Sequence, residues 1–221
     1  MGDADLTETD HADAPPGPGA APMDATRYEI LRHAEDLFGH YGFKKTSMAD
    51  IAERTKMSPG NLYRYFRNKQ AIGLAVVELF FRQSEAAMEV ALMQGDNPET
   101  RIRMILTTGC RLIVGEMARN PKLMELVEWL TEEEDAWAAL KQHIDWKRGK
   151  VEDQLALGVA SGVFADKPVY ETAVNLMHAT KAFQMPQSLN AWREPETILP
   201  ELEGVLDLVF SGIRVGSRKV G

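Results

Sequence analysis

The sequence predicts an all-α protein of about nine helices, and three observations support this fold class. Apolar residues recur at intervals of three and four along the chain, which is the spacing of one helix face. Strictly alternating runs of Val, Ile and Thr, which would indicate strands, are absent. Glycine and proline divide the chain into segments of helical length, at positions 39–42, 95–98, 120–121, 162 and 167–168.

The beginning of the chain differs from the rest in composition. Residues 1–26 carry six Asp or Glu and no Lys or Arg, and residues 12–22 contain only Ala, Asp, Pro and Gly. Such a segment has too few large apolar side chains to offset the entropy lost on ordering. It also lacks the basic and apolar regions of a secretory signal. We therefore expect residues 1–23 to be a disordered acidic tail rich in Pro, Gly and Ala.

The first of three short helices expected after the tail lies near 27–39. It has an apolar face and is expected to stop at Gly39, with Gly42 able to take positive φ in the turn that follows. The second helix is expected to begin at Ser47. Asp50 follows three residues later, as in a capping box with Asp in place of Glu.

The third helix begins only a few residues after the second ends near Thr55. Ser58 is a favoured N-cap and Pro59 a favoured first helical residue, so this start is well marked. Two short helices joined by so tight a turn form a helix-turn-helix, and the second helix of that motif fits the major groove of DNA. Residues 24–70 are therefore predicted to be a helix-turn-helix domain that binds double-stranded DNA.

The charge balance of the whole chain would by itself argue against DNA. The chain has 25 Lys and Arg against 33 Asp and Glu, a formal net charge of -8. Residues 27–70, however, carry nine Lys or Arg and five Asp or Glu. Because a duplex meets only the face presented to it, this basic segment is compatible with DNA binding although the chain as a whole is acidic.

Hydrogen-bonding, aromatic and cationic residues gather around the predicted motif. The residues expected to contact bases or phosphates are Lys44, Lys45, Thr46, Ser47, Ser58, Pro59, Gly60, Asn61, Tyr63, Arg64, Tyr65 and Lys69. Leu62 and Phe66 are expected to pack the small core instead. Packing is also an alternative for Tyr63 and Tyr65, but their positions on either side of Arg64 favour contact with DNA.

The stretch 41–71, YGFKKTSMADIAERTKMSPGNLYRYFRNKQA, closely resembles the DNA-binding domain of TetR-family transcriptional regulators. The resemblance covers about 27–75, and the run from Gly60 to Lys69 is its most specific part. It implies a homodimeric repressor whose variable helical C-terminal domain binds a ligand that weakens operator binding. It also implies DNA contacts at Thr46, Ser58, Gly60, Tyr63, Tyr65 and Lys69.

Two positions depart from the usual family pattern. Pro59 stands where Lys or Arg is frequent, which removes one phosphate contact, and Arg64 stands where an aromatic residue is common. The resemblance leaves two regulatory modes open. The first is a repressor released from a palindromic operator by a small-molecule effector. The alternative is a DNA-binding regulator that is controlled by a protein partner or is constitutive, with no small-molecule inducer.

Residues 71–221 are expected to form a helical ligand-sensing and dimerisation domain. Helices are predicted at 71–93, 98–120, 121–130, 135–158, 169–183 and about 198–213. Candidate residues of an apolar ligand pocket are Met104, Trp129, Trp137, Asn175, Met177, His178 and Phe183. Met and aromatic residues at helical spacing also pack ordinary cores, and that alternative stays open.

The terminal helix is too apolar for a simple surface helix. Its hydrophobic residues cover more than one stripe, which indicates burial against the chain's own core on one side and a partner on the other. The residues expected at this dimer interface are Leu202, Leu206, Val209 and Phe210. The resemblance likewise implies that the last two long helices pair across a twofold axis.

The sequence lacks the motifs of several other classes of protein. The single Cys110 excludes an internal disulfide and a multi-cysteine zinc site, and no phosphate loop or H-E-x-x-H is present. We therefore expect no enzyme activity, no cofactor and no metal. The longest apolar stretch, 71–81, is interrupted by Glu78 and too short to span a bilayer. The expected protein is soluble and cytoplasmic, and its partners are a near-palindromic duplex, a second copy and a small hydrophobic or amphipathic effector, with no membrane.

Overall fold

The computed structural model describes residues 24–123, 125–126, 129, 134–185 and 195–215. Within these ranges the fold is all-α, as predicted, with eight α-helices and no strand. The helices are α1 (Ala25–Tyr41), α2 (Met48–Arg54), α3 (Pro59–Tyr65), α4 (Lys69–Met93), α5 (Pro98–Arg119), α7 (Glu134–Ala160), α8 (Val169–Thr180) and α10 (Pro195–Ile213), with 3-10 turns η1 (Pro121–Leu123) and η2 (Lys181–Phe183). None of these helices combines the length and apolar content that a membrane span requires.

Two sequence predictions fall partly or wholly outside the described residues. The acidic tail at 1–23 lies outside them altogether. Of the helix predicted at 121–130, the described start is the 3-10 turn η1, and several of the residues that follow lie outside the description. The terminal helix begins at Pro195, three residues earlier than predicted, and it contains Pro200.

The caps of α2 and α3 are those predicted from the sequence. The backbone N–H of Ser47 donates to Oδ2 of Asp50 at 2.7 Å, and the N–H of Asp50 donates to Oγ of Ser47 at 3.2 Å. Oγ of Ser58 accepts from the backbone N–H of Asn61 at 3.3 Å, and Pro59 is the first residue of α3. The capping box and both helix starts are therefore confirmed.

The predicted end of α1 at Gly39 is wrong, because the helix continues to Tyr41. A Cβ atom at Gly39 would lie 2.3 Å from Oδ1 of Asn120, so this glycine permits close packing against the end of α5. The turn occurs at Gly42, whose φ of 93° is the positive value expected there.

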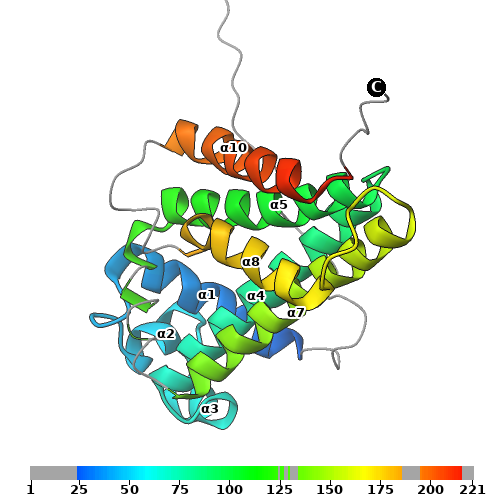
Figure 1. Cartoon of the computed structure of the whole chain (residues 1–221). Helices are drawn as coiled ribbons and strands as arrows, with labels where there is room; N and C mark the ends of the chain where they lie inside the picture. The colour runs from blue at the N-terminus through cyan, green and yellow to red at the C-terminus, as the bar shows by residue number, and fades with distance from the viewer. Residues whose placement is uncertain (1–23, 124, 127–128, 130–133, 186–194, 216–221) are drawn as a thin grey trace, which may run out of the picture.

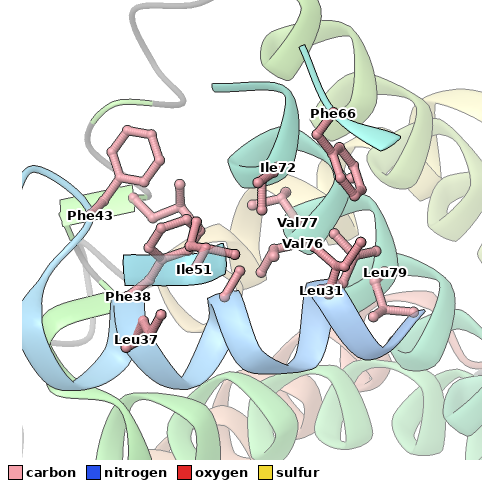
Figure 2. Packing of buried hydrophobic residues seen from close by; sticks show 14 of the residues in the cluster. Leu31, Leu37, Phe38, Phe43, Ile51, Phe66, Ile72, Val76, Val77 and Leu79 are labelled. Atoms are coloured by element: carbon pink, nitrogen blue, oxygen red, sulfur yellow. The ribbon is translucent and has the colours of Figure 1, made fainter. Parts of the chain in front are cut away.

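The N-terminal helices and the first half of α4 share one hydrophobic core (Figure 2). Leu31 and Phe38 of α1, Ile51 of α2 and Ile72 of α4 are fully buried in it. The rings of Phe38 and Phe43 meet edge to face, with centroids 5.1 Å apart. The first half of α4 packs in this core and its second half continues toward the C-terminal helices. Helix α4 therefore connects the N-terminal helices to the C-terminal helices.

The C-terminal helices pack around a second core. Leu106 of α5, Leu176 of α8 and Leu206 of α10 are fully buried in it. In Figure 1 α10 lies along α5 and α8 at the end of the molecule remote from α2 and α3. The helix-turn-helix and the terminal helix therefore occupy opposite ends of the protein.

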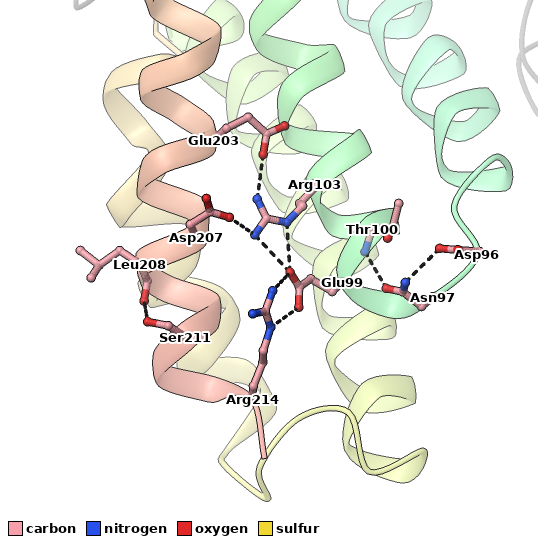
Figure 3. A network of polar contacts seen from close by, with 10 residues as sticks. All are labelled: Asp96, Asn97, Glu99, Thr100, Arg103, Glu203, Asp207, Leu208, Ser211 and Arg214. Atoms are coloured by element: carbon pink, nitrogen blue, oxygen red, sulfur yellow. Dashed lines mark hydrogen bonds and ion pairs between the residues drawn. The ribbon is translucent and has the colours of Figure 1, made fainter. Parts of the chain in front are cut away.

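A network of ion pairs fastens α10 to α5 (Figure 3). The guanidinium of Arg103 donates to Glu203 at 2.7 Å and to Asp207 at 2.6 Å, both on α10, and to Glu99 one turn earlier on α5. Arg214 at the end of α10 also donates to Glu99, at 2.7 Å. Networks that include a shared, partly buried guanidinium hold orientation better than isolated surface pairs.

Candidate nucleic-acid interface and ligand cavity

Helix α3 has a buried face and an exposed face. Leu62 and Phe66 are 0% and 2% exposed and pack in the first core, as predicted for them. Tyr63 is 54% exposed and Arg64 is also exposed, and both project from the opposite face. Nothing in the described chain covers this aromatic and cationic surface, which has the shape and donors to enter a major groove.

The first turn of α3 is open to solvent at Gly60. A Cβ atom placed there would meet no heavy atom within 4 Å, so the fold itself does not require glycine. Glycine in a helix costs about 0.5–1 kcal/mol relative to alanine. A glycine that the packing does not explain is suited to the close approach of another molecule's backbone.

Of the four residues that precede α2, three are exposed and one is buried. Lys44, Lys45 and Ser47 are exposed. Thr46 is only 3% exposed, and its Oγ1 donates to the carbonyl oxygen of Gly42 at 2.9 Å. The Thr46 hydroxyl therefore closes the turn after α1.

Lys69 also makes contacts within the chain. Its Nζ donates to the carbonyl oxygens of Phe43 at 2.7 Å and Lys44 at 3.3 Å, and it lies 4.6 Å from the centroid of the Phe43 ring. Partial burial lowers its pKa, against the opposing effects of Asp50 and Glu125. Lys69 thus ties the start of α4 to the loop before α2.

Sequence reasoning missed Arg27, which performs a similar role at the other side of the domain. Its guanidinium lies 4.1 Å from the centroid of the Phe66 ring and donates to the carbonyl oxygen of Tyr65 at 3.1 Å. Tyr65 itself is half-buried against the core. The end of α3 is therefore held to α1 through a cation–π contact and a hydrogen bond.

The turn between α2 and α3 is closed by a residue in the left-handed region. Lys56 has φ of 54°, and it is the one described non-glycine residue with positive φ. The N–H of Met57 donates to the carbonyl oxygen of Ala52 at 2.9 Å and that of Lys56 to Glu53 at 3.0 Å, the two bonds of a Schellman motif. The motif fixes the angle at which α3 leaves α2.

A cavity of about 470 Å³ lies between α4, α5, α7 and α8. This volume is within the range of small-molecule sites, which hold roughly 300–1,000 Å³. Most of its wall is apolar, and the apolar lining includes Val76, Val77, Phe80, Phe81, Met88, Ile113, Met117, Leu140, Ile144 and Val174. Glu35 of α1 also contributes to the wall, so the cavity touches both parts of the chain.

Two of the seven predicted pocket residues, Met177 and His178, line this cavity. The other five lie elsewhere: Met104 is half-buried on α5, Trp129 packs on Phe43 with centroids 4.8 Å apart, Trp137 is 55% exposed, Asn175 is exposed and Phe183 is in the second core. Trp137 and Asn175 project to solvent because they lie on the outer faces of α7 and α8.

Sequence reasoning missed two buried polar residues of the cavity wall, both on α7. Lys147 is 3% exposed, and its Nζ donates to Oε1 of Gln184 at 3.0 Å. His143 is 6% exposed, its Nδ1 lies 2.8 Å from Oε1 of Glu85, and its ring stacks on Phe81. A signal existed in the sequence, since both polar residues lie within the apolar stripe of α7.

A pair of carboxyl groups occupies another part of the wall. Glu116 is paired with Arg119 at 2.7 Å and also accepts from the side-chain amide of Asn120. Burial, followed by repulsion from Glu116 and Asp36, raises the pKa of Glu35 to about 7. Glu35 thus carries a carboxyl group that titrates near neutral pH inside the helix that begins the DNA-binding domain.

The four residues predicted at a dimer interface are mostly internal. Leu202, Leu206 and Phe210 are 0% exposed in the second core, and Val209 is half-buried against it. The outward face of α10 carries Leu208, which is 74% exposed, with Gly204 and Gly212 one turn to either side.

Comparison with known proteins identifies both parts of the chain. Residues 30–76 match the family model described as bacterial regulatory proteins, tetR family, and residues 98–205 match that of the tetracyclin repressor-like C-terminal domain. The chain is 31% identical over 99 residues to the HTH-type transcriptional regulator TcmR of Streptomyces glaucescens, covering 42% of this chain and 43% of that protein. It is 32% identical over 78 residues to the uncharacterized HTH-type regulator YuxN of Bacillus subtilis, covering 35% and 27%. The chain thus spans less than half the length of these relatives.

Solved structures extend the similarity of fold to most of the chain. The fatty acid degradation regulator FadR from Bacillus halodurans matches with a TM-score of 0.67 at 11% identity, covering 87% of this chain and 98% of that one. The TetR-family regulator PfmR from Thermus thermophilus matches with a TM-score of 0.61 at 22% identity, covering 88% and 100%. At sequence identities this low, the comparison shows a similar fold and nothing more.

Proposed function

The chain belongs to the TetR family of DNA-binding transcriptional regulators, and from this premise we propose that it is a homodimeric repressor released from a near-palindromic operator by a small-molecule effector. It acts on double-stranded DNA in the cytoplasm and is not an enzyme. The observation that carries the proposal is that one chain combines an uncovered face on α3 with an apolar cavity whose wall includes Glu35 of α1.

In this proposal α3 enters the major groove with Tyr63 and Arg64 toward the bases or phosphates. Lys44 and Lys45 lie on the exposed loop before α2, where they reach the backbone. Two heads related by a twofold axis then read half-sites about 34–36 Å apart or at a multiple of that spacing. Selection from a random duplex library supplies the operator, and a sequence without inverted symmetry would contradict the dimeric mode.

The open position at Gly60 allows a sharp test of the reading face. Gly60→Ala adds one methyl group that meets nothing in the fold, so it should preserve or slightly raise stability while weakening operator binding at least tenfold. Gly149→Ala on α7 is the matched control, since a Cβ atom there also meets nothing within 4 Å. Fluorescence anisotropy with operator DNA and urea unfolding separate the two effects. Unchanged affinity in Gly60→Ala would place the duplex elsewhere.

We further propose that dimerisation uses the outward face of α10 together with α8. Because Leu202, Leu206 and Phe210 are occupied in the chain's own core, the available contacts are Leu208 and the half-buried Val209. Gly204 and Gly212 on this face would let a second helix approach closely, as small residues do in close helix packing.

Leu208→Glu tests this interface without disturbing the core. The side chain is 74% exposed in one chain, so the variant should fold but sediment as a monomer and lose affinity for a two-half-site operator. Leu157→Glu on α7 is the control, because Leu157 is also exposed, at 51%. A Leu208→Glu variant that remains dimeric in sedimentation velocity would refute the assignment.

The effector acts, in our proposal, through α1 and α4. Val76, Val77 and Phe80 of α4 and Glu35 of α1 line the cavity, and α4 begins at Lys69, which is bonded to the loop before α2. An occupant that displaces α4 therefore moves the reading head relative to α10. Control by a protein partner would not need a cavity of this volume, so the cavity favours the small-molecule mode.

A metabolite screen distinguishes the two regulatory modes. Compounds that raise the melting temperature of the free protein are added to the protein–operator complex, and at least one should lower operator affinity. If ligands stabilise the protein but none of them changes operator affinity, regulation by a small-molecule effector is refuted and the partner-controlled or constitutive mode holds.

A further inference from the structure

The positive charge of Lys147, in the wall of the cavity, is only weakly balanced by other groups of the protein. Lys147 is 3% exposed, and its Nζ has a single hydrogen-bond acceptor among the described residues, Oε1 of Gln184 at 3.0 Å. Gln184 is held in place because its Nε2 donates to the carbonyl oxygen of Leu106 at 2.9 Å. An ammonium group has three donors, so Lys147 has donors left for another partner.

The nearby carboxylate is already engaged. Glu85 attracts Lys147 electrostatically, but its Oε1 lies 2.8 Å from Nδ1 of His143, and no described carboxylate comes within 4 Å of the lysine Nζ. Burial lowers the pKa of Lys147 to about 8, with Glu85 and Cys110 opposing that change. The group is therefore mostly protonated at neutral pH and is a buried cation that an incoming anion would stabilise.

The backbone of α5 passes close to this ammonium group at Gly109. A Cβ atom at Gly109 would lie 2.8 Å from Cε of Met88, 3.0 Å from Oε1 of Gln184 and 3.6 Å from Nζ of Lys147. The absence of a Cβ at Gly109 thus lets the side chains of Met88 and Gln184 pack against α5 close to Nζ of Lys147. The cavity continues from there along the apolar side chains of α4, α5 and α8.

The acidic part of the wall is less suited to hold a charged head group. Glu116 already pairs with Arg119 at 2.7 Å and Asn120, and Glu35 is protonated to a large extent at neutral pH because burial raises its pKa to about 7. A cationic ligand at this part of the wall would therefore meet Glu116, which is already paired, and Glu35, which is partly protonated. The charge distribution of the cavity therefore favours an anionic ligand.

We propose that the cavity binds an amphipathic carboxylate, whose head group pairs with Nζ of Lys147 and whose apolar body lies against α4, α5 and α8. The inference deepens the effector site of the proposed function and rests on it for its biological meaning. The binding itself is a property of the free protein and can be measured without DNA.

The test compares ligands of equal chain length that differ only in the head group. Decanoate, decan-1-ol and decylamine are titrated into the full chain by isothermal calorimetry at pH 7. Wild-type protein should bind decanoate at least tenfold more tightly than either of the others. In Lys147→Met, which keeps the length of the side chain and removes its charge, the preference for decanoate over decan-1-ol should fall to within twofold.

Lys141→Met is the matched control, since Lys141 lies on the same helix but is exposed and paired with Asp145. It should retain the wild-type preference. Lys147→Met removes a buried charge and should not unfold the protein, and retained decan-1-ol binding confirms that its cavity is intact. An unchanged preference in Lys147→Met, a stronger affinity for decylamine, or no binding of decanoate would each overturn the inference.

Operator binding separates this inference from the proposed function. If decanoate binds through Lys147 but no ligand alters operator affinity, the head-group assignment stands and effector-controlled release fails. If decan-1-ol or decylamine releases operator DNA while decanoate does not bind, release stands and the carboxylate assignment fails.

Discussion

Replacement of Glu35 by Gln should stabilise the protein at high pH and have little effect at low pH. Glu35 lies on α1 at the cavity wall, and burial, repulsion from Glu116 and repulsion from Asp36 together raise its pKa from 4.5 to about 7. Between those two values the folded chain holds a proton that the unfolded chain has released. Stability therefore falls as the pH rises through this window.

The size of the effect follows from the two pKa values. At 1.36 kcal/mol for each pH unit, the interval from 4.5 to about 7 corresponds to about 3 kcal/mol, an upper bound because the side chain is not fully buried. Gln resembles the neutral carboxyl group at every pH. Glu35→Gln should therefore be about 2–3 kcal/mol more stable than wild type at pH 8, and the two proteins should differ by only a few tenths of a kcal/mol at pH 4.

Urea unfolding followed by circular dichroism at pH 4 and pH 8 measures this difference, provided that the m values of the two proteins agree. Glu29→Gln is the matched control, because Glu29 is exposed on the same helix, and it should change stability by less than about 0.5 kcal/mol at either pH. A stability gain in Glu35→Gln that is equal at both pH values, or a loss at pH 8, would refute the reasoning.

Three further predictions address the turn, the second core and the cavity. Lys56→Gly should stabilise the protein by about 0.5–1 kcal/mol in urea unfolding, because φ of 54° strains any residue but glycine, and destabilisation would contradict the left-handed turn. Gly158→Ala should destabilise it by about 1–3 kcal/mol, since the new Cβ would lie 2.1 Å from the Phe164 ring. Gly149→Ala on the same helix should be neutral or stabilising, and equal effects of the two substitutions would be evidence against that packing. Decanoate affinity should decrease as the pH rises above about 8, because Lys147 of the ligand-free protein loses its proton there. The titratable groups around Lys147 are Glu85, His143 and Cys110. Calorimetry that shows constant decanoate affinity up to pH 9.5 would exclude an ammonium contact.

Much of the N-terminal part could be predicted because its signals are local. A capping box spans four residues, and an N-cap followed by proline spans two, so these signals mark helix starts without reference to the rest of the fold. The residues concerned are Ser47, Asp50, Ser58 and Pro59. The end of α1 could not be found in the same way. Gly39 resembles a helix stop in sequence, but its role depends on Asn120, which lies 81 positions later.

The candidate pocket likewise depends on packing between helices that the sequence does not reveal. Met and Trp residues were proposed from composition, yet Trp137 projects to solvent and Phe183 fills the second core. Lys and His residues in a helix are usually exposed, so the sequence does not single out Lys147 or His143. Both are buried because α4, α5 and α8 pack around α7.

The sequence by itself determined the helical class, the capped helices of the helix-turn-helix and the family of the protein, because these depend on residues within a few positions of one another. The tertiary structure decided which face of each helix is buried. It placed Leu206 and Phe210 in the chain's own core and Leu208 outside it, directed Lys69 to carbonyl groups of the loop before α2, and buried Lys147 in the wall of an apolar cavity. A helix with apolar residues on several faces has no preferred side until its neighbours are present, so burial of this kind is a property of the assembled fold.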